Sequence, residues 1–357
     1  MRETIYQQAG AAVESSQTAI AEAVTSRHFA LKPELETKYG ASGRAKCLQD
    51  NTYHLSYLAE ALRAGQPALF SDYIAWASSM LAGRGIPQND LADNLSVLRE
   101  SIIAALPAEY GRAASQYIDA GLAEISGEDA ASRAAGREEP FSDLAEGYLD
   151  ALLRGRRDEA SRLILAAVEN RMAGVRDIYL HVFQKTQHEI GRLWQINRIS
   201  VAQEHYCTAA TQMIMSQLYP HIFSPRRRGR TLVAASVSGD LHEIGVRIVA
   251  DFFEMDGWDT FYLGANTPVA SLLETVRERR ADLLLLSATM TYHLRFVREI
   301  IEKMRADERT ARVKIMVGGY PFNVAPDLWR ELGADGFAPD ADAAVGEANR
   351  LLDAGQE

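Results

Sequence analysis

An aspartate and a histidine two residues apart, Asp240 and His242, are the side chains best suited to metal chemistry in this chain. An imidazole is a good ligand for a borderline transition metal. A nearby carboxylate can accept the other ring N–H and so fix the tautomer. Gly245 then leaves room for a bulky group against the helix expected to follow. We therefore expect a ligand site along Ser238-Gly239-Asp240-Leu241-His242-Glu243-Ile244-Gly245.

Two further short segments have the composition of a ligand crevice. Ser287 and Thr289 would supply hydroxyl groups, and they are separated by a single alanine. Gly318 and Gly319, followed by Tyr320, would let the backbone approach a ligand closely. These segments predict polar contacts and a close backbone approach beside the histidine.

The elements that position these residues belong to an α/β domain over 229–357. Short apolar strands are expected at 231–237, 259–263, 282–287, 314–317 and 336–338. Helical patterns lie between and after them, at 244–256, 268–280, 293–306, 325–333 and 340–353. This alternation predicts a five-stranded parallel sheet. In the flavodoxin-like order the ligand crevice lies at the carboxyl ends of the first and third strands, where the motif residues fall.

The motif Asp-x-His-x-x-Gly at 240–245, with Ser-x-Thr at 287–289 and Gly-Gly at 318–319, resembles the cobalamin-binding domain family over residues 230–355. The resemblance implies that His242 replaces the dimethylbenzimidazole of the cofactor as the lower axial ligand of cobalt. The displaced nucleotide tail would enter a slot lined by the other two segments. A receiver domain would need an aspartate where Ser287 stands, and the Gly-x-Gly-x-x-Gly of dinucleotide-binding domains is absent after the first strand.

Residues 141–225 are expected to form a four-helix-bundle cap above this crevice. Ser200-Val201-Ala202-Gln203 is a capping-box pattern, which predicts a helix that begins at Val201. Val201, Glu204 and His205 would then project from one face of that helix. Trp194 ends the preceding helix and could fold over the same place.

Trp194 with Glu204-His205 resembles the cap of the cobalamin-dependent photoreceptors of the CarH type. The resemblance implies that Trp194 packs against an upper adenosyl group, Glu204 contacts its ribose and Val201 faces the same pocket. It also implies that His205 takes the upper axial site of cobalt after photolysis. The alternative is that Trp194 is ordinary core and that Glu204-His205 is an exposed pair.

Residues 1–125 are expected to form a helical domain, followed by a linker at 126–140 that is rich in small and charged residues. Its aromatic content resembles the photocobilins, which carry biliverdin as a second chromophore. The residues that the resemblance implies near a tetrapyrrole are His54, Tyr57, Tyr73, Trp76 and Cys47, the last not as a covalent attachment point. The alternative is that these aromatics are core of a helical bundle. The DNA-binding winged helix with which the CarH-type family usually begins is not recognisable here.

Composition excludes several classes of protein. The net charge is −10, so no direct nucleic-acid partner is expected. Cys47 and Cys207 are too few and too far apart for a disulfide framework or a cysteine metal site. No apolar run approaches the length of a membrane span, so we expect a cytoplasmic protein without a membrane partner.

These observations favour a light sensor rather than an enzyme. We expect adenosylcobalamin as cofactor, with biliverdin as a second one. Photolysis would change the conformation of the cap and the state of a light-dependent homo-oligomer. The signal would then pass to an effector protein partner or act through the quaternary state itself. The main alternative is a methyl-carrier corrinoid protein of a methyltransferase system, in whose caps a Glu-His pair is unexpected. A radical mutase would need a substrate barrel that residues 1–225 do not predict, and a scaffold without cofactor would not need the motif residues.

Overall fold

The computed structural model describes residues 4–125, 140–223 and 227–353; most of the expected linker at 126–140 lies outside them. The chain divides into two compact units. One holds the N-terminal helices together with residues 290–295 and 324–332, and the other holds most of the remainder. Among the described residues, no helix is both long and apolar enough to cross a membrane.

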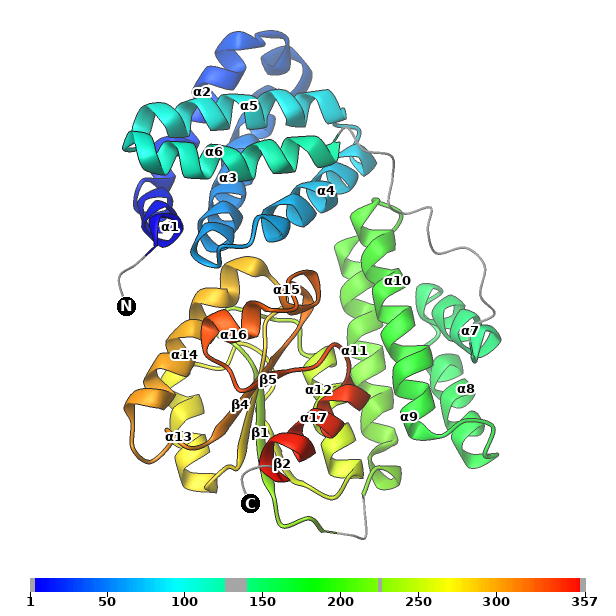
Figure 1. The fold of residues 1–357 in the computed structure, drawn as a ribbon. Coiled ribbons are helices and arrows are strands. Elements are labelled where there is room, and N and C mark those ends of the chain that lie inside the picture. The colour runs from blue at the N-terminus through cyan, green and yellow to red at the C-terminus, as the bar shows by residue number, and fades with distance from the viewer. Residues whose placement is uncertain (1–3, 126–139, 224–226, 354–357) are drawn as a thin grey trace. The chain divides into compact units, whose positions relative to one another are not determined.

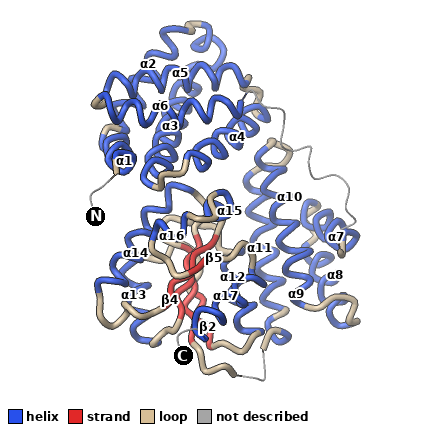
Figure 2. The backbone as a smooth tube through the Cα atoms, in the orientation of Figure 1, coloured by secondary structure: helices blue, strands red, loops and turns tan. Residues whose placement is uncertain are grey.

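The N-terminal region consists of helices (Figures 1 and 2). Thr4 begins the first with a capping box, and Pro67 occupies the first turn of the fourth, where its missing N–H costs nothing. Gly40 adopts a φ of 63° and kinks the third helix. The helices are α1 (Ile5–Ser15), α2 (Gln17–Leu31), α3 (Glu34–Arg63), α4 (Pro67–Gly83), α5 (Gln88–Ala105) and α6 (Ala108–Ile125).

The next region is the helical cap. It contains α7 (Ser142–Leu153), α8 (Arg157–Glu169), a long run made of α9 (Val175–Asp177), the π-helical turn η2 (Ile178–Phe183) and α10 (Gln184–Gln195), then α11 (Val201–Gln217) and the short η3 (Tyr219–His221). Ser200 accepts a hydrogen bond from the backbone of Gln203, so α11 begins at the predicted residue. Tyr148, Tyr179 and Phe183 are fully buried between these helices.

A five-stranded parallel sheet follows, with strand order β2-β1-β3-β4-β5, as the sequence predicted. The strands are β1 (Thr231–Ser236), β2 (Asp259–Tyr262), β3 (Leu283–Ser287), β4 (Lys314–Gly318) and β5 (Gly336–Phe337). Ser236 pairs with Ser287, and Ser287 pairs with Gly318. The carboxyl ends of the three central strands are therefore level, which brings the loops after them to one edge.

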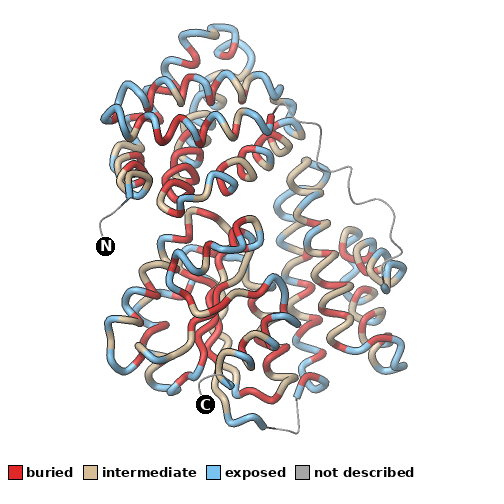
Figure 3. The backbone as a smooth tube through the Cα atoms, viewed as in Figure 1, coloured by how far each residue is buried: buried red, intermediate tan, exposed pale blue. Residues whose placement is uncertain are grey.

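Helices cover both faces of the sheet, and the strands are largely buried between them (Figure 3). They are α12 (Ile244–Met255), α13 (Val269–Arg279), α14 (Leu294–Ala306) and α17 (Ala341–Asp353). The short elements η4 (Thr291–His293), after β3, and α15 (Tyr320–Val324) and α16 (Leu328–Leu332), after β4, complete this part of the chain. The helix expected over 325–333 is found as the shorter α16, and α15, which lies before that range, was not expected. Phe252 and Phe253 of α12 share one buried core with Ile214 and Met215 of α11. The cap therefore packs on the α12 face of the sheet.

Candidate functional site

Asp240 is the centre of the site, and its side chain is fully buried. One carboxylate oxygen accepts hydrogen bonds from His242 Nδ1 at 2.8 Å and from the His242 backbone N–H at 3.0 Å. The other accepts one from the backbone N–H of Thr289 at 2.5 Å. A buried carboxylate needs such donors to offset its desolvation. Asp240 therefore ties the loop after β1 to the loop after β3 and holds the imidazole in one orientation.

The imidazole of His242 faces outward, and its side chain is 59% exposed. Because Nδ1 donates to Asp240, Nε2 keeps the lone pair that a metal requires. The hydrogen bond to Asp240 raises the pKa of His242, burial opposes that rise, and the charges of Asp240 and Glu204 add to it. The result is an oriented, basic nitrogen on the open side of the loop.

The rest of the loop is held by hydrogen bonds between side chains and backbone groups. Ser236 Oγ donates to the carbonyl of His242 at 2.9 Å, and Ser238 Oγ donates to the carbonyl of Thr267 at 2.9 Å. The Gly239 N–H donates to Asn266 Oδ1 at 2.7 Å. The expected ligand contact Ser238 thus uses its hydroxyl proton within the protein.

The loops after β3 and β4 approach each other closely. Gly319 has a φ of 100°, and a Cβ there would lie 2.1 Å from the carbonyl oxygen of Ala288. Only glycine fits such a position. Gly318 accepts a hydrogen bond from the Ala288 N–H, so Ser287, Thr289 and the glycine pair line one edge of the sheet.

Open space and exposed side chains mark the segments that carry the motif residues. A Cβ at Gly245, in the first turn of α12, would meet no atom within 4 Å. Leu241 is 73% exposed and Tyr320 is 54% exposed, which is high for apolar side chains. Ile244 instead is half-buried against the core shared with the cap.

The cap presents Glu204 and His205 from the first turns of α11. Glu204 contacts His205 Nδ1 at 2.5 Å through one oxygen and accepts a hydrogen bond from Thr208 at 3.0 Å through the other. His205 is 74% exposed. Val201 is exposed one turn earlier, and Trp194 is half-buried at the end of α10. The negative charge of Glu204 is among the causes of the raised pKa of His242, after the contributions of Asp240 and burial.

Glu243, expected as a ligand contact, has both carboxylate oxygens engaged by donors of the protein. Its carboxylate accepts hydrogen bonds from Gln212 Nε2 at 2.5 Å and from the Tyr262 hydroxyl at 3.0 Å. Gln212 lies on α11 and Tyr262 on β2, so sequence reasoning missed both. No local pattern marks partners that are 31 and 19 residues away.

The residues present fit a corrinoid. Within 4–125, 140–223 and 227–353, no group of three or more His, Cys, Asp or Glu side chains is placed to hold a bare metal ion. A corrin ring brings its own four equatorial nitrogens, so one protein nitrogen is enough. His242 Nε2 would be placed to supply that nitrogen, and the open space at Gly245 with the exposed, apolar Leu241 suits the face of a flat macrocycle.

The aromatic candidates in the N-terminal helices pack on one another. The hydroxyl of Tyr73 lies 2.8 Å from His54 Nδ1, and Tyr57 stacks on Tyr73 with ring centroids 3.6 Å apart. The ring of Trp76 lies 6.3 Å from that of Tyr73. His54 is buried, and burial lowers its pKa to about 4. This mutual packing favours the alternative that these aromatic side chains belong to the core of a helical bundle.

Cys47 has little of the character of a reactive thiol. Burial raises its pKa to about 11, and two asparagine side chains, Asn51 and Asn94, donate to its sulfur. A thiolate is the reactive form, so such a cysteine is a poor nucleophile.

Two family models, both described as B12 binding domain, match residues 230–348 and 144–219. Dimethylamine corrinoid protein 2 of Methanosarcina acetivorans is 29% identical over 226 residues, which cover 61% of this chain and 98% of that protein. Dimethylamine corrinoid protein 1 of the same organism is 31% identical over 171 residues, covering 46% and 78%. The solved monomethylamine corrinoid protein of Methanosarcina barkeri is 22% identical with a TM-score of 0.51, covering 59% of this chain and 98% of that one. This last likeness concerns the fold alone.

Proposed function

The chain belongs to the family of corrinoid proteins with B12-binding domains, and on this premise we propose that it is a methyl carrier of a methyltransferase system. The observation that carries the proposal is the geometry of His242. Its Nδ1 is bound to a buried carboxylate and its Nε2 faces an open, partly apolar space. The names of the relatives, dimethylamine corrinoid proteins, support methyl transfer as the use of that site.

Two expectations from the sequence are corrected by these relatives. The prediction of an adenosylcobalamin light sensor is wrong, because the relatives are named for methylamine systems. The prediction of a light-dependent homo-oligomer is wrong for the same reason. The resemblance of Trp194 and Glu204-His205 to a photoreceptor cap was therefore misleading. The proposed cofactor is a corrinoid with methyl as the transferred group, in place of an adenosyl group with biliverdin.

Each residue of the site has a definite task in the proposal. When bound, a corrinoid would supply a cobalt centre able to carry a methyl group. His242 Nε2 would bind that cobalt, and Asp240 would keep the proton on Nδ1 and so strengthen the imidazole as a ligand. Ser287, Thr289 and the Gly318-Gly319 pair line the slot for the nucleotide tail. Glu204, His205 and Val201 face the upper side.

The proposed partner is a methyltransferase, with a methylamine as the class of methyl donor. The exposed side chains at the site support this partner. Val201 and Leu241 leave apolar surface at the crevice, which a second protein could cover while it reaches the upper face.

The relative affinity for two cofactor forms tests the proposal. The apo chain is titrated with methylcobalamin and with adenosylcobalamin in the dark. A methyl carrier should bind methylcobalamin at least as tightly as adenosylcobalamin. A preference for adenosylcobalamin of about tenfold or more, equivalent to about 1.4 kcal/mol, would contradict the proposal.

A further inference from the structure

One face of α11 carries a polar stripe of residues spaced by four: Glu204, Thr208, Gln212 and Ser216. Residues at this spacing lie above one another on a helix. The lower half of the stripe is docked on α12. Gln212 donates to Glu243, and Arg247 donates to the carbonyl of Gln212 at 3.2 Å and to Ser216 Oγ at 2.9 Å.

The upper half of the stripe makes its hydrogen bonds within the cap. The Thr208 hydroxyl lies within hydrogen-bond distance of Glu204 Oε1 and, at a longer distance, of Gln187 Oε1, and Glu204 also contacts the neighbouring His205. Val201, at the start of the same helix, is 52% exposed. The helix is thus docked on the sheet domain at one end, while its other end presents Glu204 and Val201 within the cap.

We call the hydrogen bond between Gln212 and Glu243 the clamp. Glu243 contributes a second contact to the same region. One carboxylate oxygen accepts from Gln212 and the other from Tyr262, so the side chain joins α11 to β2. The space around it is tight, because a Cβ at Gly264 would lie 3.3 Å from Glu243 Oε2. Glu243 is also the residue directly after His242, so the same backbone segment holds the clamp and the imidazole.

The length of the helix between the clamp and the site sets a distance. Gln212 and Glu204 are eight residues apart, which is about 12 Å along the helix axis at about 1.5 Å per residue. A helix held firmly at Gln212 therefore holds Glu204 and Val201 at a fixed height over His242. A loose clamp would let that height vary.

We infer that Glu243 is a positioning residue that acts through Gln212 to hold the cap helix at a fixed distance above the corrinoid, and that it does not contact the corrinoid itself. The inference rests on the proposed corrinoid site at His242. In this inference Glu243 positions the helix on the upper side of the corrinoid. The preceding residue, His242, would bind cobalt from the lower side.

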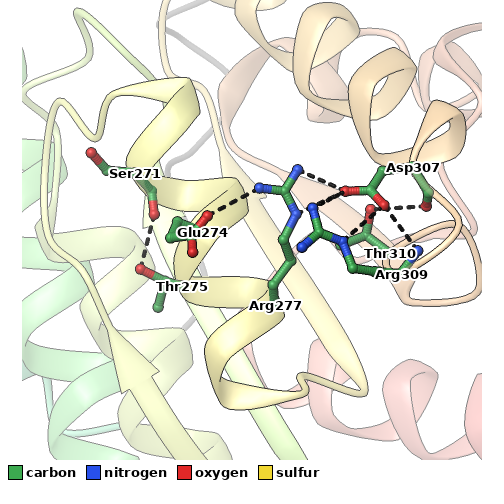
Figure 4. A network of polar contacts seen from close by, with 7 residues as sticks. All are labelled: Ser271, Glu274, Thr275, Arg277, Asp307, Arg309 and Thr310. Carbon is green, nitrogen blue, oxygen red and sulfur yellow. Dashed lines mark hydrogen bonds and ion pairs between the residues drawn. The ribbon is translucent and has the colours of Figure 1, made fainter.

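The test uses two single variants, a paired exchange and a control. Glu243→Ala and Gln212→Ala each remove one side of the clamp. Combining Gln212→Glu with Glu243→Gln restores a hydrogen bond with donor and acceptor reversed, and the amide oxygen introduced at position 243 can still accept from Tyr262. Glu274→Ala is the control, because Glu274 bonds Arg277 in the surface network of α13 and belongs to neither side of the clamp (Figure 4).

Two measurements report on the clamp. In the apo chain, hydrogen exchange of the backbone amides over 208–217 reports how firmly α11 is docked. In the chain loaded with aquocobalamin, the rate of azide substitution for the upper water ligand reports access to the upper face. We expect both single variants to raise the exchange and the azide rate by about fivefold or more. The paired exchange should return both rates to near the wild-type values, and the control should leave them unchanged.

Rates that stay at the wild-type level in the folded Glu243→Ala variant would overturn the inference. So would a paired exchange that rescues neither rate, because the hydrogen bond would then not be the cause. Failure of the proposed site gives a different result: the wild-type chain would show no cobalt ligation by His242, while the apo exchange measurement would still report on the clamp.

Discussion

The backbone N–H of Thr289 and the imidazole of His242 are bound to opposite oxygens of one buried carboxylate, that of Asp240. Thr289 and Asp240 are 49 residues apart in the chain. This relationship makes the position of the imidazole depend on the loop after β3 as well as on its own loop. Asp240 therefore both ties the two loops together and orients the imidazole of His242.

Replacing Asp240 by Asn should weaken corrinoid binding. The amide keeps one acceptor oxygen, but its NH₂ group would face either the Thr289 N–H or His242 Nδ1. We expect the affinity for hydroxocobalamin to fall by about 10- to 100-fold in an absorbance titration, as for other partners of metal-bound histidines. Asp158→Asn, at a side chain that is 70% exposed on α8, is the control. Equal affinity of Asp240→Asn and wild type would contradict this role.

Two glycine-to-alanine changes should have opposite signatures. At Gly319 the new Cβ would strike the Ala288 carbonyl, so Gly319→Ala should destabilise the apo chain by about 3 kcal/mol.

At Gly245 the Cβ enters open space in a helix, so the apo chain of Gly245→Ala should keep or slightly gain stability. Corrinoid affinity should nevertheless fall by about tenfold in Gly245→Ala, because the methyl group occupies space meant for the macrocycle. Denaturant unfolding and a cobalamin titration check both; full affinity in Gly245→Ala would rule out that use of the space.

Asp251 on α12 should lower stability at neutral pH. Burial raises its pKa to about 6, although the Tyr179 hydroxyl donates to it at 2.8 Å. Because the folded pKa exceeds the unfolded one, stability is lost as pH rises from about 4 to about 6. Asp251→Asn can still accept from Tyr179, so it should stabilise the chain at pH 8 by about 2 kcal/mol, discounted for partial exposure, and have little effect at pH 4. A destabilised variant at pH 8 would show that the ionised form is favoured instead.

His54 should make the N-terminal helices sensitive to acid. Its folded pKa is lowered to about 4 by burial, so the unfolded chain takes up a proton first as the pH falls. The stability of wild type is therefore complete above about pH 6.5 and declines towards pH 4, by about 3 kcal/mol. His54→Phe should lack that part of the decline. The measurement is urea unfolding of both chains at pH 7 and pH 4.5; parallel losses in the two would contradict the assignment.

Local patterns predicted much of the fold. The apolar runs gave the positions of the strands, and Ser200 with Gln203 gave the first residue of α11, because strand patterns and helix caps are local properties. The kink at Gly40 and the π-helical turn at 178–183 were not predicted. The short helix α15 was not predicted either.

The site was predictable only in part. Asp240 and His242 are neighbours in sequence, so their hydrogen bond followed from spacing alone. The pairing of Glu243 with Gln212 depends on how α11 crosses α12, which no short motif encodes. The Glu204-His205 pair pointed to the wrong use of the cofactor, because side chains on the upper face do not by themselves identify the transferred group.

The central claim is that His242 Nε2 ligates cobalt. The most direct measurement is the electron paramagnetic resonance spectrum of the chain loaded with Co(II) cobalamin after growth with ¹⁵N-labelled histidine. We predict superhyperfine splitting from one ¹⁵N nucleus in the wild-type chain and its loss in His242→Ala. A splitting pattern from ¹⁴N in the labelled wild-type chain, or one that persists unchanged in His242→Ala, would contradict the claim.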